Sequence, residues 1–188
     1  NQMASGDRVY LEANSKVEFM SIDSAAGGAG PYSYTVTRNL DGTGANAWDA
    51  GDAVFNTGTT NDGFIDLYSV RSVKSATQYG PTIVGNVRNS ATYNDWTECW
   101  AIGNLNGLYG YGADTYGAAF GKYSAANYMT IDPTNGVRFL DTDDVVRAQL
   151  TSTTWTLGST ADNHVNISAG HVYLKNGATV YTDLAAGV

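Results

Sequence analysis

Aromatic and amide side chains crowd one stretch of this 188-residue chain, between residues 94 and 116. Aromatic rings stack on the apolar faces of sugars and amides bond sugar hydroxyls, while Tyr and Trp offer rigid contact area at small entropic cost. This chemistry predicts a contact site for a glycan or for another protein, formed by Trp96, Trp100, Tyr109, Tyr111, Tyr116, Asn104 and Asn106. For any one of these aromatics, a place in a β-domain core or between subunits is an equally valid interpretation.

Two carboxylates flank Trp96 and are the best candidates for glycoside hydrolysis. That reaction needs two carboxyl groups about 5–10 Å apart across a sugar cleft, and Asp95 and Glu98 are close in sequence. A polysaccharide depolymerase acting there is the weaker alternative, because such enzymes usually carry these residues on a long right-handed β-helix, for which this chain is short. The acidic cluster at 141–144 falls between two expected strands, and we interpret it as a solvated turn.

Nucleophilic catalysis of the Ser-His-Asp type needs a histidine base, and the chain has only His164 and His171. Both fall among short expected strands, and no Gly-x-Ser-x-Gly nucleophile elbow occurs. Their spacing of seven is odd, and within one strand an odd spacing turns two side chains to opposite faces, away from a shared metal. If the two repeat units stack in equivalent turns, the histidines could still line up, but metal binding there is the weaker alternative. We therefore expect no catalytic residue, no metal ligand and no enzymatic activity.

An oxygen-rich loop at residues 41–52 is a weak candidate for Ca²⁺ binding. It contains Asp41, Asp49 and Asp52, but it lacks the ligand spacing and the terminal Glu of a twelve-residue calcium loop. We interpret it as an ordinary surface loop and expect no cofactor.

The composition excludes several classes of protein. The net charge of −8 opposes nucleic-acid binding, which needs a basic surface, and no run of 18 apolar residues could span a membrane. Hydrophobic residues make up 43% of the chain, which excludes intrinsic disorder. The single cysteine, Cys99, excludes an intrachain disulfide and a cysteine-rich zinc site, and we expect it to be half-buried.

Strands have to position the candidate residues, because signs of helices are scarce. Apolar and polar residues alternate with the two-residue period of a strand, and pairs such as Asp41-Gly42 and Asn135-Gly136 mark turns between them. The expected strands lie at residues 9–12, 17–20, 32–37, 64–70, 82–87, 128–131, 137–140, 145–150 and 154–158. Short strands at this spacing predict an all-β fold.

The chain changes character twice along its length. Residues 1–20 have the pattern of one or two leading strands or a linker. Residues 21–121 hold most of the aromatics and are expected to form a globular, β-sandwich-like body, whereas residues 122–188 form a ladder of short strands. The start at Asn1 suggests a fragment of a longer polypeptide.

A seven-residue repeat appears near the end of the ladder. The sequence HVNISAG at 164–170 is followed by HVYLKNG at 171–177 and by a degraded third copy at 178–181. Each copy predicts a strand with two inward apolar residues and a Gly that permits positive φ at the turn. So narrow a ladder cannot bury both faces alone. It either folds onto the body or wraps with identical chains around a shared axis as a β-rich stem, usually a trimer.

Six short phrases of the sequence form a distinctive set: GFIDLYSV at 63–70, GPTIVGNVR at 80–88, WAIGNLNGLYGYG at 100–112, AFGKYS at 119–124, YMTID at 128–132 and NGVRF at 135–139. They resemble segments of tail-fibre and tail-spike-like structural proteins of bacteriophages and prophages. The resemblance covers residues 60–185. It consists of a similar general residue pattern and short shared phrases, and it includes no catalytic signature.

The resemblance implies an extracellular virion component on the phage tail, assembled as an intertwined homotrimer. Its partners would be two further copies of the chain, other tail proteins and a glycan or protein of the host cell surface, with no nucleic acid and no membrane insertion. The main alternative is a purely structural role, as a shaft or self-assembling filament subunit whose aromatics are buried between chains.

Overall fold

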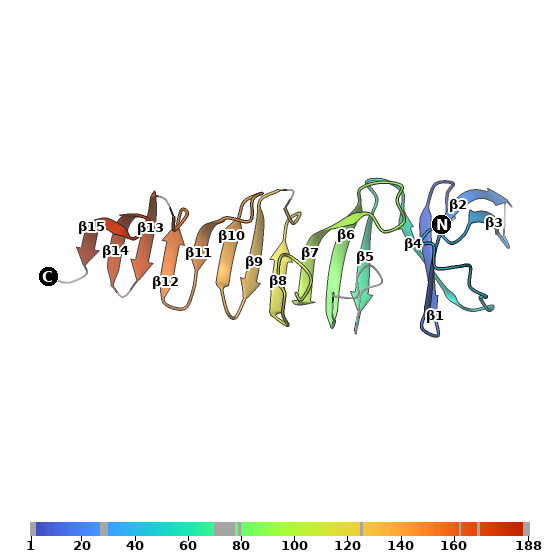
Figure 1. Cartoon of the computed structure of the whole chain (residues 1–188), viewed down its shortest axis with the longest axis horizontal. Helices are drawn as coiled ribbons and strands as arrows, with labels where there is room; N and C mark the ends of the chain where they lie inside the picture. Colours follow the sequence, from blue (N-terminus) through green and yellow to red (C-terminus); the bar gives the residue numbers. More distant parts are fainter. Residues whose placement is uncertain are drawn as a thin grey trace. The chain divides into compact units, whose positions relative to one another are not determined.

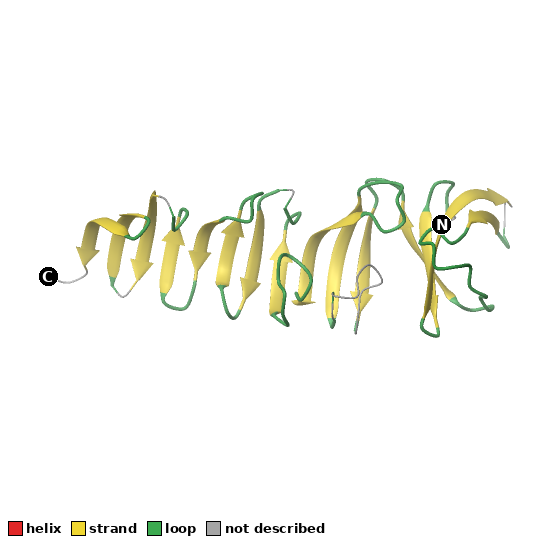
Figure 2. Ribbon diagram, in the orientation of Figure 1, coloured by secondary structure: helices red, strands yellow, loops and turns green. Residues whose placement is uncertain are grey.

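The computed structural model describes residues 3–26, 30–69, 78, 80–124, 126–161, 163–168 and 170–185. In these ranges the regular elements are β-strands, arranged in two antiparallel sheets, which confirms the all-β prediction (Figures 1 and 2). None of the described segments forms a helix long and apolar enough to cross a membrane.

The chain divides into two compact units. Unit 1 comprises residues 1–66 and 85–97, and unit 2 comprises residues 67–84 and 98–188. Each unit has its own core.

The sheet of unit 1 has four strands in the order β3-β2-β1-β4. These strands are β1 (Arg8–Ala13), β2 (Lys16–Ala26), β3 (Ser33–Thr37) and β4 (Ala53–Gly58). The strands expected at 9–12, 17–20 and 32–37 are confirmed, whereas β4 had not been predicted. Asn14 and Ser15 join β1 to β2 with positive φ at both residues, as a type I′ hairpin turn requires.

A fully buried carboxylate, Glu18, anchors unit 1. It accepts hydrogen bonds from Nε of Arg38 at 2.9 Å, from the Trp48 indole at 2.7 Å and from the backbone N–H of Asn46 at 2.9 Å. Burial by itself would raise the pKa of Glu18, but these donors and the Arg38 charge outweigh it and lower the pKa to about 2. Glu18 therefore holds the loop that contains Asn46 and Trp48 against the sheet.

A fully buried arginine, Arg88, connects β4 with the loop at residues 89–95 in unit 1. Its guanidinium donates to the carbonyl oxygens of Thr57 (3.3 Å), Thr92 (2.7 Å) and Tyr93 (3.2 Å), and it lies over the ring of Trp96 at 5.5 Å. Backbone oxygens thus satisfy a buried charge that would otherwise be costly.

Substitution of Arg88 by Met is expected to lower the free energy of unfolding of unit 1 by about 3 kcal/mol, because buried carbonyls lose their donors. Chemical denaturation followed by tryptophan fluorescence measures this change. The control is Lys16→Met at an exposed position, which is expected to change stability by no more than about 0.5 kcal/mol. Equal stability of the two variants would contradict the anchoring role of Arg88.

The second sheet has eleven strands, each hydrogen-bonded to its neighbours in the chain (Figure 1). They are β5 (Gly63–Tyr68), β6 (Thr82–Arg88), β7 (Trp96–Asn104), β8 (Tyr116–Phe120), β9 (Tyr128–Asp132), β10 (Gly136–Leu140), β11 (Val146–Leu150), β12 (Thr154–Leu157), β13 (Asn163–Ser168), β14 (His171–Asn176) and β15 (Thr179–Ala185). The remaining predicted strands are confirmed, except that residue 70 lies outside the described residues. The turn glycines of the repeat, Gly170 and Gly177, have the expected positive φ.

The core of unit 2 lies on one side of strands β7 to β10. Ala101, Ala119 and Leu140 of these strands pack with Leu105 and Leu108 from the loop between β7 and β8. This loop therefore covers one side of the sheet with apolar side chains.

Candidate functional site

Two unbroken rows of cross-strand partners run over one side of strands β7 to β15. In an antiparallel pair, directly opposed residues project to the same side of the sheet, so the register traces each row from strand to strand. The first row is Ile102, Ala118, Ile131, Val137, Leu150, Trp155, Ile167, Val172 and Leu184. The second is Trp100, Phe120, Met129, Phe139, Ala148, Leu157, Val165, Leu174 and Thr182. We call this side the apolar face.

Large side chains of the apolar face are open to solvent in the single chain. Those with exposed fractions between 39% and 61% are Ile102, Tyr116, Phe120, Ile131, Phe139, Leu150, Trp155, Leu157, Leu174 and Leu184. Because free side chains of this size offer up to roughly 150–250 Å² each, together they present on the order of 1,000 Å². The largest apolar patch of a typical monomer is only about 300–600 Å².

The opposite side of the same strands is polar and better covered. The row that alternates with the two apolar rows is Ala101, Ala119, Thr130, Arg138, Gln149, Thr156, Asn166, Tyr173 and Asp183. Thr130 and Thr156 are buried, and the Asn166 amide donates to Thr156 Oγ1 at 3.0 Å. Large apolar side chains are thus exposed on the apolar face, whereas the opposite side buries the core of unit 2 together with Thr130 and Thr156.

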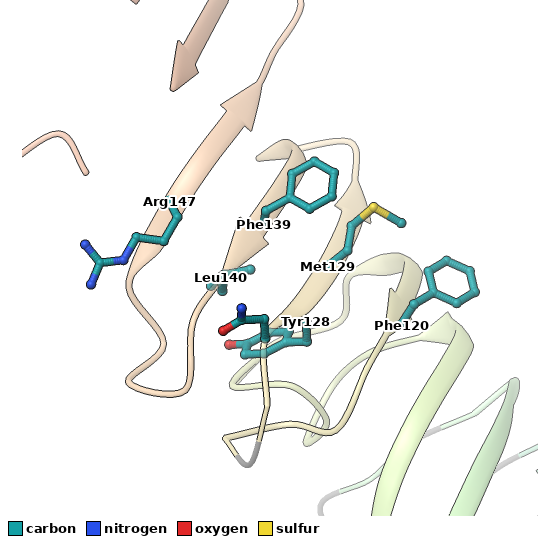
Figure 3. Close-up of a pocket in the computed structure, with 7 residues that line it drawn as sticks. Phe120, Tyr128, Met129, Phe139, Leu140 and Arg147 are labelled. Atoms are coloured by element: carbon teal, nitrogen blue, oxygen red, sulfur yellow. The ribbon is translucent and has the colours of Figure 1, made fainter. Parts of the chain in front are cut away.

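A hollow of about 300 Å³ lies beside the second row and is lined by side chains from both sides of the sheet. Phe120, Met129 and Phe139, from three successive strands, project to the same side there (Figure 3). The rest of its lining is Asn127, Tyr128, Leu140 and Arg147. The hollow is large enough to receive an apolar side chain from outside the chain.

The structure divides the predicted contact residues into three groups. Trp100 and Tyr116 lie on the apolar face. Trp96 lies in unit 1, only 4% exposed, with Phe64 packed edge-on to its indole at 5.2 Å. Asn104 is the last residue of β7, and Asn106, Tyr109 and Tyr111 lie in the loop between β7 and β8.

Asn104 and Asn106 both bind one carboxylate, that of Asp114. Their side-chain amides donate to the same Asp114 oxygen at 2.9 Å and 3.0 Å, and these bonds lower the pKa of Asp114. Asn104 is buried, and its side-chain oxygen also accepts the N–H of Asn106 at 3.0 Å. The two amides therefore fix the shape of the loop that carries Tyr109 and Tyr111.

Tyr109 and Tyr111 belong to a group with Tyr123 and Tyr128, which we call the tyrosine cluster. The rings of Tyr109, Tyr123 and Tyr128 form a triangle in which each pair of centroids is 5.6 Å apart. The Tyr109 hydroxyl donates to the Gly121 carbonyl at 2.7 Å. Sequence reasoning missed Tyr123 and Tyr128, although the high density of tyrosines continues past residue 116 to residue 128 and could have indicated them.

Charged groups fix the hydroxyls of Tyr111 and Tyr128. The Tyr111 hydroxyl donates to Asp132 at 2.5 Å and accepts from Arg138 at 2.7 Å. Burial raises the pKa of Tyr111, and its bond to Asp132 adds to the rise. Burial would also raise the pKa of Asp132, but donors from Tyr111, Asn135 and the following backbone lower it instead. Asp132 thus stays ionised and holds the ring of Tyr111 in place.

Tyr128 donates to Asp144 at 2.8 Å, and burial together with this carboxylate raises the pKa of Tyr128. Asp144 and Asp143 are exposed, which confirms the solvated turn expected at 141–144. Asp141 lies at the start of this turn, where the Val145 N–H and Arg147 lower its pKa.

The other candidate carboxylates accept hydrogen bonds from side chains of their own unit. Asp95 accepts from Asn89 at 3.0 Å within unit 1, and Glu98 accepts from Gln78 at 3.3 Å within unit 2. In the loop at 41–52, Asp41 accepts from the hydroxyl of Thr43 at 3.0 Å. Across the residues that the structure describes, His, Cys, Asp and Glu side chains do not gather in threes as a metal site requires.

His164 and His171 share one side of the sheet, because a turn separates them and the two repeat copies stack as neighbouring strands, the alternative to opposite faces within one strand. Strands β13 and β14 form a hairpin in which His164 opposes Lys175 and Ser168 opposes His171, which puts both histidines on the polar side. His164 is buried, and His171 lies 2.7 Å from an Asp183 carboxylate oxygen.

Comparisons with protein-family models, with curated proteins and with solved structures found no match to this chain.

Proposed function

We propose that this chain is a subunit of a homotrimeric, β-rich bacteriophage tail fibre that binds the surface of the host cell. The observation that carries the proposal is the apolar face. Its exposed area, on the order of 1,000 Å², exceeds the roughly 800 Å² that each partner contributes to a stable protein interface. In water this face would be a strong driving force for association.

Further copies of the chain suit the apolar face better than an unrelated partner does. Neither row contains a charged side chain, so the face offers a different protein no charge pattern for specific recognition. A second copy presents the same two rows at the same strand spacing, and three sheets around one axis bury all their apolar faces together. This proposal includes an intertwined ladder at 122–188, a sandwich-like body at 21–121 and an extracellular location on the virion.

A purely structural shaft or filament subunit is the second candidate. The observation that favours it is the place of Trp100 and Tyr116 on the apolar face, where assembly would bury both between chains. In the host-binding proposal, by contrast, contact with the host would fall to the tyrosine cluster on the opposite side of the sheet.

Light scattering of the purified chain tests the assembly. The expected result is a mass of three chains of 19.9 kDa each, retained on heating in mild detergent because the contact is large and apolar. A mass of one chain would contradict the proposed fibre, and a mass of two would contradict the trimer.

A further inference from the structure

A hollow of about 520 Å³ lies within unit 2 beside the tyrosine cluster. Its lining includes the four tyrosines, Asn135 and Arg138, with Gly110 and Gly112 at its loop side. Arg138 belongs to the polar row, so this tyrosine hollow opens on the side of the sheet opposite the apolar face. Assembly through the apolar face would leave it accessible. Its size lies in the range of about 300–1,000 Å³ that small-molecule sites occupy.

The aromatic walls of the hollow are held rigidly before any ligand arrives. Hydroxyl bonds fix Tyr109 to Gly121, Tyr111 to Asp132 and Tyr128 to Asp144, while Tyr123 packs between two of the other rings. Rings fixed in this way lose little conformational entropy on binding. Little of the free energy gained from contact with a ligand is therefore spent on ordering them.

Polar groups at the hollow can both donate to and accept from hydroxyls. Arg138 uses Nε on Thr130 and Nη2 on Tyr111, whereas its Nη1 has no acceptor among the residues that the structure describes. Asn135 donates its amide N–H to Asp132, and its side-chain oxygen likewise meets no donor in the described ranges. A free donor beside a free acceptor matches a hydroxyl group, which does both.

The charges at the hollow favour a neutral ligand. One cation, Arg138, faces two carboxylates, Asp132 at 3.7 Å and Asp144 in the lining. Asp132 already pairs with the positive charge of Arg138, so an anionic ligand would be repelled by Asp144. Among the described residues that line the hollow, no other cation would offset this repulsion.

We propose that the tyrosine hollow is a binding site for a neutral hexopyranose, as a single sugar or as the terminal unit of a glycan. The partly exposed rings of Tyr111 and Tyr123, supported from behind by the buried Tyr109 and Tyr128, pack on the apolar faces of the sugar. Arg138, Asn135 and Asp144 bond its hydroxyls. The inference rests on the proposed function, since a host-binding fibre meets such sugars on the cell surface. The hollow itself lies inside one chain and does not require the trimer.

Saturation-transfer NMR with D-glucose, D-galactose and D-mannose, each titrated to about 50 mM, tests the site. At least one of these sugars is expected to bind in the millimolar range, as suits a small, exposed and uncharged ligand. D-glucuronic acid is the charged probe, and it is expected to bind at least tenfold more weakly. Absence of saturation by every neutral hexose, or a preference for the acid, would overturn the inference.

A blocking variant keeps the test independent of folding. A Cβ at Gly112 meets nothing within 4 Å, so Gly112→Phe is expected to occupy the hollow, keep the thermal unfolding midpoint and weaken sugar binding at least tenfold. Tyr123→Ala is expected to weaken binding as well, and the control Tyr32→Ala, an exposed tyrosine of unit 1, is expected to leave it unchanged. Undiminished binding by Gly112→Phe would overturn the proposed location.

Light scattering of the same samples separates this inference from the proposed function. A single-chain mass with intact sugar binding would contradict the fibre and support the site. A trimer that binds none of the three hexoses would support the assembly and overturn the site.

Discussion

Replacing Phe139 with Glu is expected to reduce the mass in solution from three chains to one. Phe139 is 51% exposed in the single chain and lies mid-row on the apolar face, between its cross-strand partners Met129 and Ala148. In the proposed trimer, three carboxylates would be buried against apolar rows, and each uncompensated charge costs several kcal/mol. In the separate chain the new carboxylate reaches water, so the fold is expected to remain.

Val180→Glu is the matched control for this experiment. Val180 is 47% exposed, but it opposes Lys175 and therefore lies on the polar side of the sheet. The control is expected to stay trimeric, and circular dichroism checks that both variants keep their strands. If Phe139→Glu remained trimeric, or if both variants dissociated equally, the apolar face would not be the assembly surface.

Replacing Glu18 with Ala is expected to lower the free energy of unfolding of unit 1 by about 3–5 kcal/mol. The substitution leaves the Arg38 guanidinium, the Trp48 indole and the Asn46 N–H without the carboxylate that accepts all three. Denaturant unfolding followed by tryptophan fluorescence measures the loss. Glu12→Ala, an exposed carboxylate on the adjacent strand, is the control and is expected to change stability by no more than about 0.5 kcal/mol.

The same carboxylate is expected to make unit 1 sensitive to acid. The folded pKa of Glu18 is about 2, below the value of about 4.3 for an unfolded Glu, so the unfolded state binds the proton more tightly. The stabilisation is therefore complete above about pH 5 and is lost as pH falls toward 2, by about 3 kcal/mol in all. Glu18→Gln is expected to flatten this part of the profile, and an unchanged profile in that variant would contradict the assignment.

The strands were predictable where the chain encodes them locally. At residues 128–140 apolar and polar residues alternate on both sides of a turn that ends in Asn135-Gly136, and the hairpin of β9 and β10 forms there. In contrast, β4 and β8 contain Gly, Ala and Asn with little alternation, and they are strands because their neighbours offer them hydrogen-bonding edges.

Alternation identifies the side chains that share a face but not what covers that face. Val172 and Leu174 were expected to point inward, and they do share one side of the sheet, but Leu174 is exposed there in the single chain. The tyrosine cluster was only half predictable for a related reason. Tyr109 and Tyr111 are close in sequence, whereas Tyr128 and Arg138 reach them through strand pairing, which the sequence does not display.

The chain-order pairing of the second sheet has a consequence for how the ladder folds and how its length can change. From β9 to β15 every strand pairs with the strand made just before it, so closing each hairpin joins residues that are near in sequence. Such low contact order favours rapid, stepwise folding in the order of synthesis, despite an all-β composition. It also makes the hairpin a unit of insertion and deletion, since removing two adjacent strands leaves the flanking strands antiparallel and both apolar rows continuous.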